Sequence, residues 1–250
     1  SPTLSPPCRA DRPLSPSRAT TAAMHIYLVR HGQSHVNLTD LTASHRNEPL
    51  TDVGRAQAAA VATYLADTLR VDRLMASSVE RAADTAAANA ESLGLPVESD
   101  DRIREIGTVH PDGSPVEDAQ LQPYLPEMWG TLRPYEPVTA GGESWLQLRS
   151  RVGSFIESLL PMPPRGVSRT MQHLADAEAH VEHVVVVVCH AGVIEAFFEY
   201  VFEKGPWSVV EVDTNNTGVS HLEYRPTPHR PDWRLHFHNR TVHLTPDLIT

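Results

Sequence analysis

The sequence predicts an α/β fold in which buried parallel strands alternate with helices. Two apolar runs of strand-forming residues, at 26–29 and 184–188, carry this prediction, because continuous runs of this kind are typical of strands buried on both faces. Each run leads to a histidine, His31 or His190, that a glycine follows within two residues. Ligands of open α/β sheets bind beyond the carboxyl ends of the strands. Both histidines are therefore expected at one ligand-binding edge.

Residues 1–23 precede the first strand and are rich in Pro, Ser, Arg and Ala, with no apolar period. They lack the hydrophobic segment of a signal peptide, and we expect a disordered N-terminal extension. Met24 directly precedes the strand, so the extension could equally lie upstream of the native start. Residues 24–250 are expected to form a single domain.

The composition favours a globular protein of the cytoplasm. The formal net charge is −10, which disfavours nonspecific binding to nucleic acid but still allows a local cationic pocket for an anionic substrate. Cys8 and Cys189 are the two cysteines, and their placement does not indicate a framework disulfide. No stretch is long enough to span a membrane, so no membrane partner is expected.

The first half of the chain predicts two further strands, each associated with a helix. A Thr-Asp pair at 51–52 is a suitable cap for a helix that extends to about residue 69. Residues 71–76 are expected to form a strand, which ends at two serines just before a helix that contains Arg81. A Gly-Leu-Pro sequence ends that helix, and residues 97–99 are expected to form a short third strand.

From about 108 to 141 the chain has many prolines and little periodicity, with one short helix expected near 120–129. We expect this excursion to form a wall above the binding edge. The rest of the chain predicts two helices and a hairpin-like pair of strands at the sheet edge, at 143–160, 171–180, 217–224 and 233–238.

The polar residues that follow the first strand suit the binding of an anion. Arg30 supplies a planar fork of donors and His31 an imidazole, while Gln33, Ser34 and Asn37 are further polar groups that could bind oxygens. The alternative for this stretch is an ordinary strand exit with a solvated Arg-His pair. For the second strand, the alternative is a core histidine bonded to the backbone.

Five separated motifs follow one another along the chain. They are Leu28-Val29-Arg30-His31-Gly32-Gln33-Ser34 with Asn37, Leu50-Thr51-Asp52-Val53-Gly54-Arg55-Ala56-Gln57-Ala58, Ser77-Ser78-Val79-Glu80-Arg81-Ala82-Ala83-Asp84-Thr85-Ala86, Gly142-Glu143-Ser144 and His190-Ala191-Gly192. Together they resemble the histidine phosphatase superfamily, in the branch that includes cofactor-dependent phosphoglycerate mutases. The resemblance covers about 25–244 and implies a three-layer α/β/α sandwich, with a mostly parallel sheet and one antiparallel edge strand.

The resemblance also implies the roles of the site residues. His31 is expected to be the nucleophile that becomes phosphohistidine, with His190, Arg30, Arg81 and Asn37 as ligands of the phosphoryl group. An imidazole suits this role because it is nucleophilic when neutral near pH 7.

Glu105 falls where the family has its general acid, on a loop after the third strand. The alternative for Glu105 is a surface ion pair with Arg102 or Arg104. In the other branch of the superfamily an Asp follows the second histidine directly, and here Ala191 occupies that position, which favours Glu105.

No cofactor and no metal are implied. Two pairs of histidines, His180 with His183 and His236 with His238, have no accompanying carboxylate or cysteine set that would indicate a metal site.

The sequence therefore predicts a phosphomonoesterase that hydrolyses a small phosphorylated metabolite through phosphohistidine on His31. One alternative is a cofactor-dependent phosphoglycerate mutase, although residues 104–109 depart from the Asn-Glu-Arg-His-Tyr-Gly motif of the mutases. A second alternative is a non-catalytic module for phosphate binding or partner recognition. The physiological substrate stays open, and a homodimer is compatible with the sequence.

Overall fold

The computed structural model describes residues 21–38, 47–125, 133–160, 180–202, 212–226 and 230–250. A sheet of six strands forms the middle layer, in the order β3-β2-β4-β1-β5-β6. The strands are β1 Thr21–Arg30, β2 Arg73–Ala76, β3 Val97–Ser99, β4 His180–Cys189, β5 Val219–Tyr224 and β6 Trp233–Arg240. The α-helices are α1 Asp52–Thr68, α2 Glu80–Leu93, α3 Trp145–Leu159 and α5 Ala191–Val201.

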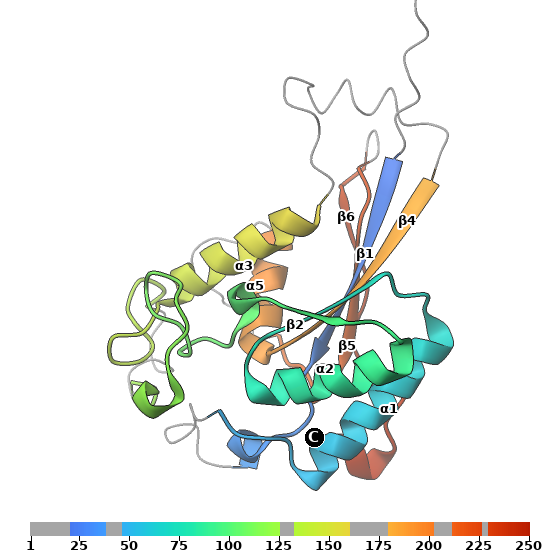
Figure 1. Ribbon diagram of the computed structural model, residues 1–250. Coiled ribbons are helices and arrows are strands. Elements are labelled where there is room, and N and C mark those ends of the chain that lie inside the picture. Colours follow the sequence, from blue (N-terminus) through green and yellow to red (C-terminus); the bar gives the residue numbers. More distant parts are fainter. Residues whose placement is uncertain (1–20, 39–46, 126–132, 161–179, 203–211, 227–229) are drawn as a thin grey trace, which may run out of the picture.

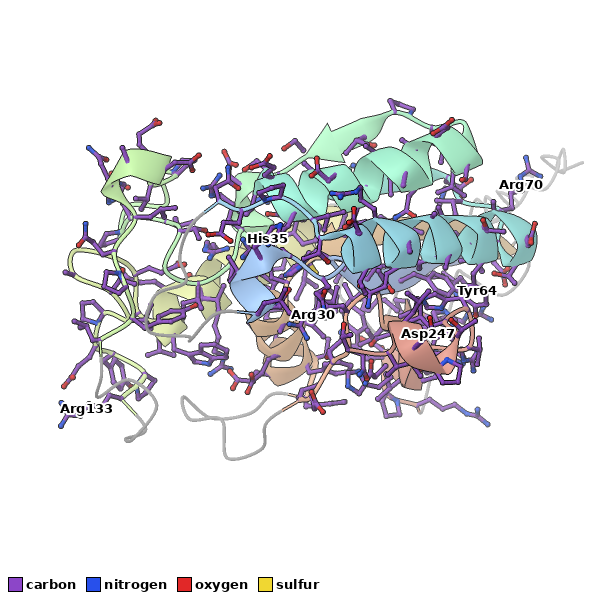
Figure 2. The ribbon with its side chains drawn as sticks, turned by 90° about the horizontal axis from the view of Figure 1, so that it is seen from below. Arg30, His35, Tyr64, Arg70, Arg133 and Asp247 are labelled. Atoms are coloured by element: carbon purple, nitrogen blue, oxygen red, sulfur yellow. The ribbon has the colours of Figure 1, made fainter. Side chains whose placement is uncertain are left out.

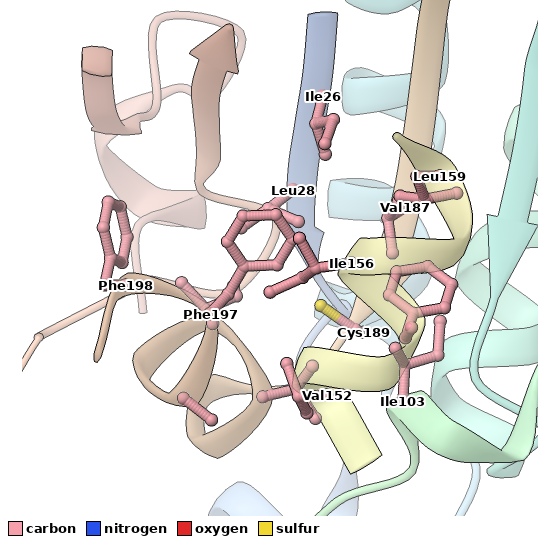
Figure 3. Close-up of a cluster of buried hydrophobic side chains, with 14 of the residues drawn as sticks. Ile26, Leu28, Ile103, Val152, Ile156, Leu159, Val187, Cys189, Phe197 and Phe198 are labelled. Carbon is pink, nitrogen blue, oxygen red and sulfur yellow. The ribbon is translucent and has the colours of Figure 1, made fainter. Parts of the chain in front are cut away.

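The helices cover the sheet from two sides and complete three layers (Figure 1). Side chains of β1 and β4 alternate between the two faces, since Leu28 and Val187 pack with α3 and α5 whereas Val29 and Val188 pack with α1 and α2. Figure 3 shows the first of these cores, in which Leu28 lies among aromatic and aliphatic side chains of α3 and α5. The expected α/β/α sandwich is therefore confirmed.

The sheet is mostly parallel, with its antiparallel pairings at one side. β3, β2, β4 and β1 pair in parallel, and β5 pairs antiparallel with both β1 and β6. The expected antiparallel strand is thus β5, which lies one position inside the edge, and β6 forms the edge itself. The expected hairpin-like pair is present.

The two central strands place the predicted histidines side by side. β1 and β4 pair over their full length, with Arg30 opposite Cys189, so His31 and His190 both leave the sheet at the same level. The Cys189 thiol is free and fully buried, and burial raises its pKa. It is part of the core on the α3 and α5 side of the sheet (Figure 3).

Local sequence signals set the helix boundaries. Thr51 caps α1 by accepting a hydrogen bond from the Gly54 N–H at 3.0 Å. Ser144 and Gln147 form a reciprocal capping box at the start of α3. Gly94 ends α2 in the left-handed region, with φ of 67°.

Some predicted boundaries differ from the structure. β1 begins at Thr21, so residues 21–23 belong to the strand and not to the expected extension, because they pair with residues 180–182 of β4. The expected helix near 120–129 is wrong for its described part, where a 3-10 helix at Asp118–Gln120 ends before 121–125. Most of the expected helix at 171–180 and all of residues 1–20 lie outside the described residues.

Among the described residues, no helix is both long enough and apolar enough to cross a membrane.

Candidate active site

The site forms where β1 and β4 end. The backbone N–H of His31 donates to the Cys189 carbonyl at 2.9 Å, which continues the strand pairing to the histidine itself. The ring centroids of His31 and His190 lie 5.2 Å apart, and both side chains are buried. The first strand does not end in a solvated Arg-His pair, because His31 is buried. His190 is not a core histidine bonded to the backbone, because its ring bonds to a side chain.

The hydrogen bonds of His31 define which ring nitrogen is available for chemistry. Nδ1 lies 2.7 Å from the Gly32 carbonyl oxygen, which can only accept, so Nδ1 carries the proton. Nε2 is therefore unprotonated, and its lone pair accepts a hydrogen bond from the Nε of Arg81 at 3.1 Å. Burial lowers the pKa of His31 well below its usual value, and the charges of Arg81 and Arg30 lower it further. The ring is neutral and nucleophilic near pH 7.

Two guanidinium groups supply positive charge to the site. Arg81 is buried in the first turn of α2, and Arg30 ends β1 and donates through Nη1 to the Thr214 carbonyl. Burial lowers the pKa of both arginines, and the negative charge of Glu105 opposes that shift in each case. The Nε of Arg30 is buried and has no partner among the described residues. This edge of the sheet is therefore cationic despite the acidic net charge of the chain.

The second histidine is held by a serine. The Nε2 of His190 lies 2.8 Å from the Oγ of Ser77, which follows β2 directly. The Nδ1 of His190 is buried and has no partner in the described part of the chain. Burial lowers the pKa of His190 well below its usual value, and the charges of Arg81 and His31 lower it further. This imidazole is also neutral near pH 7.

Glu105 reaches the same edge from the loop after β3. Its carboxylate accepts hydrogen bonds from the backbone N–H groups of Ile106 at 2.9 Å and Gly192 at 3.4 Å. The expected alternative, an ion pair with Arg102 or Arg104, is wrong, because Arg102 pairs with Asp100 and Arg104 bonds to Thr108 and Ser78. The carboxylate thus lies at the start of α5, two residues beyond His190.

The Gly-Glu-Ser motif supports the backbone at Glu105 through an arginine of α3. Glu143 and Arg151 form a buried ion pair, with a bidentate contact at 2.5 and 2.8 Å. The same guanidinium donates to the carbonyl groups of Arg102 at 2.8 Å and Glu105 at 3.4 Å. The ion pair therefore orients the backbone that carries the carboxylate.

The Leu-Thr-x-x-Gly-x-x-Gln motif holds the loop behind His31. Gln57 accepts from the N–H of Gln33 at 2.7 Å and donates to the Leu248 carbonyl at 2.7 Å. The 3-10 helix Pro246–Leu248 accordingly packs against α1 (Figure 2). A Cβ on Gly54 would lie 1.9 Å from the Gln33 carbonyl oxygen, which explains why only glycine fits there.

Three expected phosphate ligands make other contacts. Gln33 accepts through Oε1 from the Thr51 hydroxyl at 2.9 Å. The N–H and hydroxyl of Ser34 both donate to the Oδ1 of Asn37, which also accepts from Asn216 at 3.5 Å. Asn37 is exposed and Ser34 is fully buried, so these three side chains brace the loop in this conformation.

The excursion contributes one partly buried phenol to the site. The hydroxyl of Tyr124 donates to the Ile106 carbonyl at 3.3 Å. Burial raises the pKa of Tyr124 well above its usual value, Glu105 raises it further, and Arg81 opposes the rise. Tyr124 therefore lies within the electrostatic range of both charged groups. Sequence reasoning did not select Tyr124, because an isolated aromatic in an aperiodic segment gives no signal for its tertiary contacts.

Within the described ranges, no group of three or more His, Cys, Asp or Glu residues is placed to hold a metal ion. His236 bonds to Glu223 at 2.8 Å, and His238 bonds to Ser220 and to the Asp213 carbonyl. These contacts account for the second histidine pair. For the first pair, the side chain of His180 lies outside the description, and His183 is exposed.

Comparison with known families agrees with this geometry. The model of the histidine phosphatase superfamily (branch 1) matches residues 26–239. The chain belongs to this superfamily. The resemblance seen in the sequence is thereby confirmed, and the match includes both histidines and all the structural motifs around them.

Sequence relatives of this chain include phosphatases and mutases. The mitochondrial serine/threonine-protein phosphatase PGAM5 of Mus musculus is 27% identical over 208 residues, which are 82% of this chain and 59% of the relative. A 2,3-bisphosphoglycerate-dependent phosphoglycerate mutase of Methylobacterium sp. (strain 4-46) is 34% identical over 146 residues, 56% of this chain and 70% of the relative. The chain thus spans about three fifths of the length of its PGAM5 relative.

Solved structures share the fold of this chain. A mycobacterial glucosyl-3-phosphoglycerate phosphatase has a TM-score of 0.62 at 24% identity, covering 88% of this chain and 100% of the other. A phosphoserine phosphatase from Entamoeba histolytica, solved with phosphoserine, has a TM-score of 0.60 at 20% identity, with 89% and 100% covered. At these identities, the likeness shows a shared fold.

Proposed function

We propose that the protein is a phosphomonoesterase that hydrolyses a small phosphorylated metabolite through a phosphohistidine on His31. The observation that carries this proposal is the neutral His31 ring, whose Nε2 lone pair lies beside the Arg81 guanidinium at 3.1 Å. A nucleophile and a cationic donor at one point are what phosphoryl transfer requires.

In the first step, the Nε2 lone pair of His31 attacks phosphorus, so an N–P bond forms as the ester P–O bond breaks. Arg81 and Arg30 offer planar N–H donors to the oxygens on which negative charge collects. Glu105 in its protonated form gives its proton to the leaving alkoxide, which departs as the alcohol.

In the second step, the Glu105 carboxylate removes a proton from a water molecule that attacks phosphorus. The N–P bond breaks, inorganic phosphate leaves, and both His31 and Glu105 return to their starting protonation states. The chain's own residues supply every group in this cycle, so we propose a reaction that is independent of metal.

Charge in the excursion favours a substrate with one phosphate. Residues 108–141 contain a single Lys or Arg, Arg133, which is exposed and pairs with Glu136 at 2.9 Å. A second phosphate would need its own cluster of cationic donors. The proposed substrate class is therefore a monophosphorylated metabolite.

The test measures phosphate release by the full chain from p-nitrophenyl phosphate and from a panel of phosphorylated metabolites, with chelator present. We expect release from both, and an acid-labile, alkali-stable phosphoenzyme that His31→Ala abolishes. His35→Ala is the matched control, because His35 is an exposed histidine four residues further along. Isomerisation of 3-phosphoglycerate faster than phosphate release would favour the mutase. No release, with His31→Ala binding phosphate like the parent, would favour the non-catalytic module.

A further inference from the structure

Ser77 is buried between the end of β2 and the start of α2, where it touches His190. Its backbone N–H donates to the Val188 carbonyl at 3.0 Å, and its Oγ accepts from the N–H of Val79 at 3.2 Å. These bonds hold the hydroxyl in place. The same Oγ lies 2.8 Å from the Nε2 of His190.

The direction of the bond between Ser77 and His190 follows from counting protons. A hydroxyl carries one proton, and among the described residues His190 is the one available acceptor for the proton of Ser77. If Nε2 carried the ring proton, the buried hydroxyl would have no acceptor, which is costly. Ser77 therefore donates to an Nε2 lone pair, and the proton of the neutral ring lies on Nδ1.

We propose that Ser77 is a positioning residue that keeps His190 in the Nδ1–H tautomer, so that the ring presents an N–H donor to the phosphoryl oxygens. This inference rests on the proposed function of the site. In the opposite tautomer, Nδ1 would turn a lone pair toward anionic oxygens and repel them. Because the Nδ1 of His190 has no partner within the described part of the chain, its N–H is available to a ligand.

The two histidines would then share one tautomer and perform opposite tasks. In His31, the Gly32 carbonyl fixes the proton on Nδ1 and leaves Nε2 as the nucleophile. In His190, Ser77 also fixes the proton on Nδ1. There Nε2 accepts the hydrogen bond of Ser77, and the Nδ1–H group is the one that would bind the phosphoryl oxygens. A neutral donor of this kind works without titration of the ring, so phosphate binding would not need an imidazolium.

Nitrogen-15 NMR of the full chain with labelled histidine tests the tautomer directly. A His190→Gln variant assigns the two ring nitrogens. We expect a protonated Nδ1 and an unprotonated Nε2, with inorganic phosphate shifting the Nδ1 resonance more than that of Nε2. A protonated Nε2 in the wild-type protein would overturn the proposal. So would a phosphate-induced shift confined to Nε2.

Variants separate positioning from simple structural support. Ser77→Ala should give a mixed or reversed tautomer and weaken inhibition by vanadate by about 10-fold or more, and Ser77→Thr, which keeps the hydroxyl, should retain the wild-type tautomer. Ser78→Ala is the matched control, because the Ser78 hydroxyl contacts Asp101 and Arg104 and not His190. An unchanged tautomer in Ser77→Ala would overturn the proposal.

Two further outcomes are informative. If the Ser77 variants do not fold, the wild-type spectrum alone decides between the tautomers. If the wild-type chain shows the Nδ1–H tautomer and binds phosphate but releases none from any ester, the positioning role stands and the proposed phosphatase activity fails.

Discussion

The Nε of Arg81 donates to the Nε2 of His31 across 3.1 Å, so a buried guanidinium holds the lone pair of a buried imidazole. The two residues are fifty positions apart, and they meet because α2 begins shortly after β2, at the same edge of the sheet at which β1 ends. In the proposed reaction, the same guanidinium would donate hydrogen bonds to the phosphoryl oxygens on which negative charge develops.

Loss of the Arg81 fork should therefore reduce catalysis strongly. We expect Arg81→Ala to lower kcat/KM by about 10²- to 10³-fold, as for other donors to a transition state, and Arg81→Lys to restore only part of it, because a point charge replaces a planar fork. Steady-state kinetics with p-nitrophenyl phosphate measures both. Arg70→Ala is the control, since Arg70 is exposed and lies two residues beyond the end of α1. Wild-type activity in Arg81→Ala would contradict the proposed pocket.

A methyl group at residue 192 should displace Glu105, the proposed general acid. The Cβ of Gly192→Ala would lie 2.5 Å from the Oε1 of Glu105, which forces the carboxylate to move. Proton donation matters more for an alkoxide than for a stabilised phenolate, and general acids contribute about 10²- to 10⁴-fold. We expect a loss of about 10²-fold or more with alkyl phosphates and a much smaller loss with p-nitrophenyl phosphate, as for Glu105→Gln. Equal losses with both substrates would argue against this role of Glu105.

The buried ion pair behind the loop should matter for stability. Glu143→Gln leaves the Arg151 guanidinium buried without its charge partner, and breaking such a pair costs about 3–5 kcal/mol. The pair of Arg73 with Glu98 is half-exposed, so Glu98→Gln is a matched control with an expected cost of about 1 kcal/mol or less. Urea denaturation measures the stability of the two variants. Similar midpoints would contradict the larger cost expected for Glu143→Gln.

Glycine at position 54 should be required for the loop that carries His31. In a helix, Gly→Ala normally stabilises by about 1 kcal/mol, but here the new Cβ would lie 1.9 Å from the Gln33 carbonyl oxygen. We expect Gly54→Ala to destabilise the fold by about 2 kcal/mol or more and to lower kcat. Ala56→Gly on the exposed side of α1 should cost about 1 kcal/mol without affecting kcat. A stabilised Gly54→Ala protein would refute the close approach seen here.

Buried histidines should make the fold sensitive to acid. Burial lowers the pKa of His221 to about 4, helped by His236 and His25. Between about pH 6.5 and pH 4 the unfolded chain binds the proton and the native chain does not, so stability falls as the pH falls through this window.

The variant His221→Phe removes one of these titrations. The loss of unfolding free energy between pH 7.5 and pH 5.5 should shrink by about 1 kcal/mol or less, because part of the ring is within reach of solvent. Urea denaturation at both pH values measures this. The same pH dependence in parent and variant would contradict the contribution of His221.

The alternation of apolar runs and polar loops in the sequence was enough to predict the α/β fold, because a strand buried on both faces needs a continuous apolar run. The same pattern predicted that His31 and His190 would meet, since parallel strands end at one edge. It failed at 121–125, the described part of an expected helix, where the backbone of Tyr124 pairs with Thr139 in an isolated bridge.

Only the tertiary structure decided how the site residues work. The tautomers of His31 and His190 depend on Gly32 and Ser77, and the position of Glu105 depends on the start of α5. Gln33, Ser34 and Asn37 stay predicted ligands, and the structure adds that Gln33 bonds to Thr51 and Ser34 to Asn37. Periodicity and motifs report burial and chain direction, whereas the direction of a hydrogen bond is set by the group across the fold that completes it.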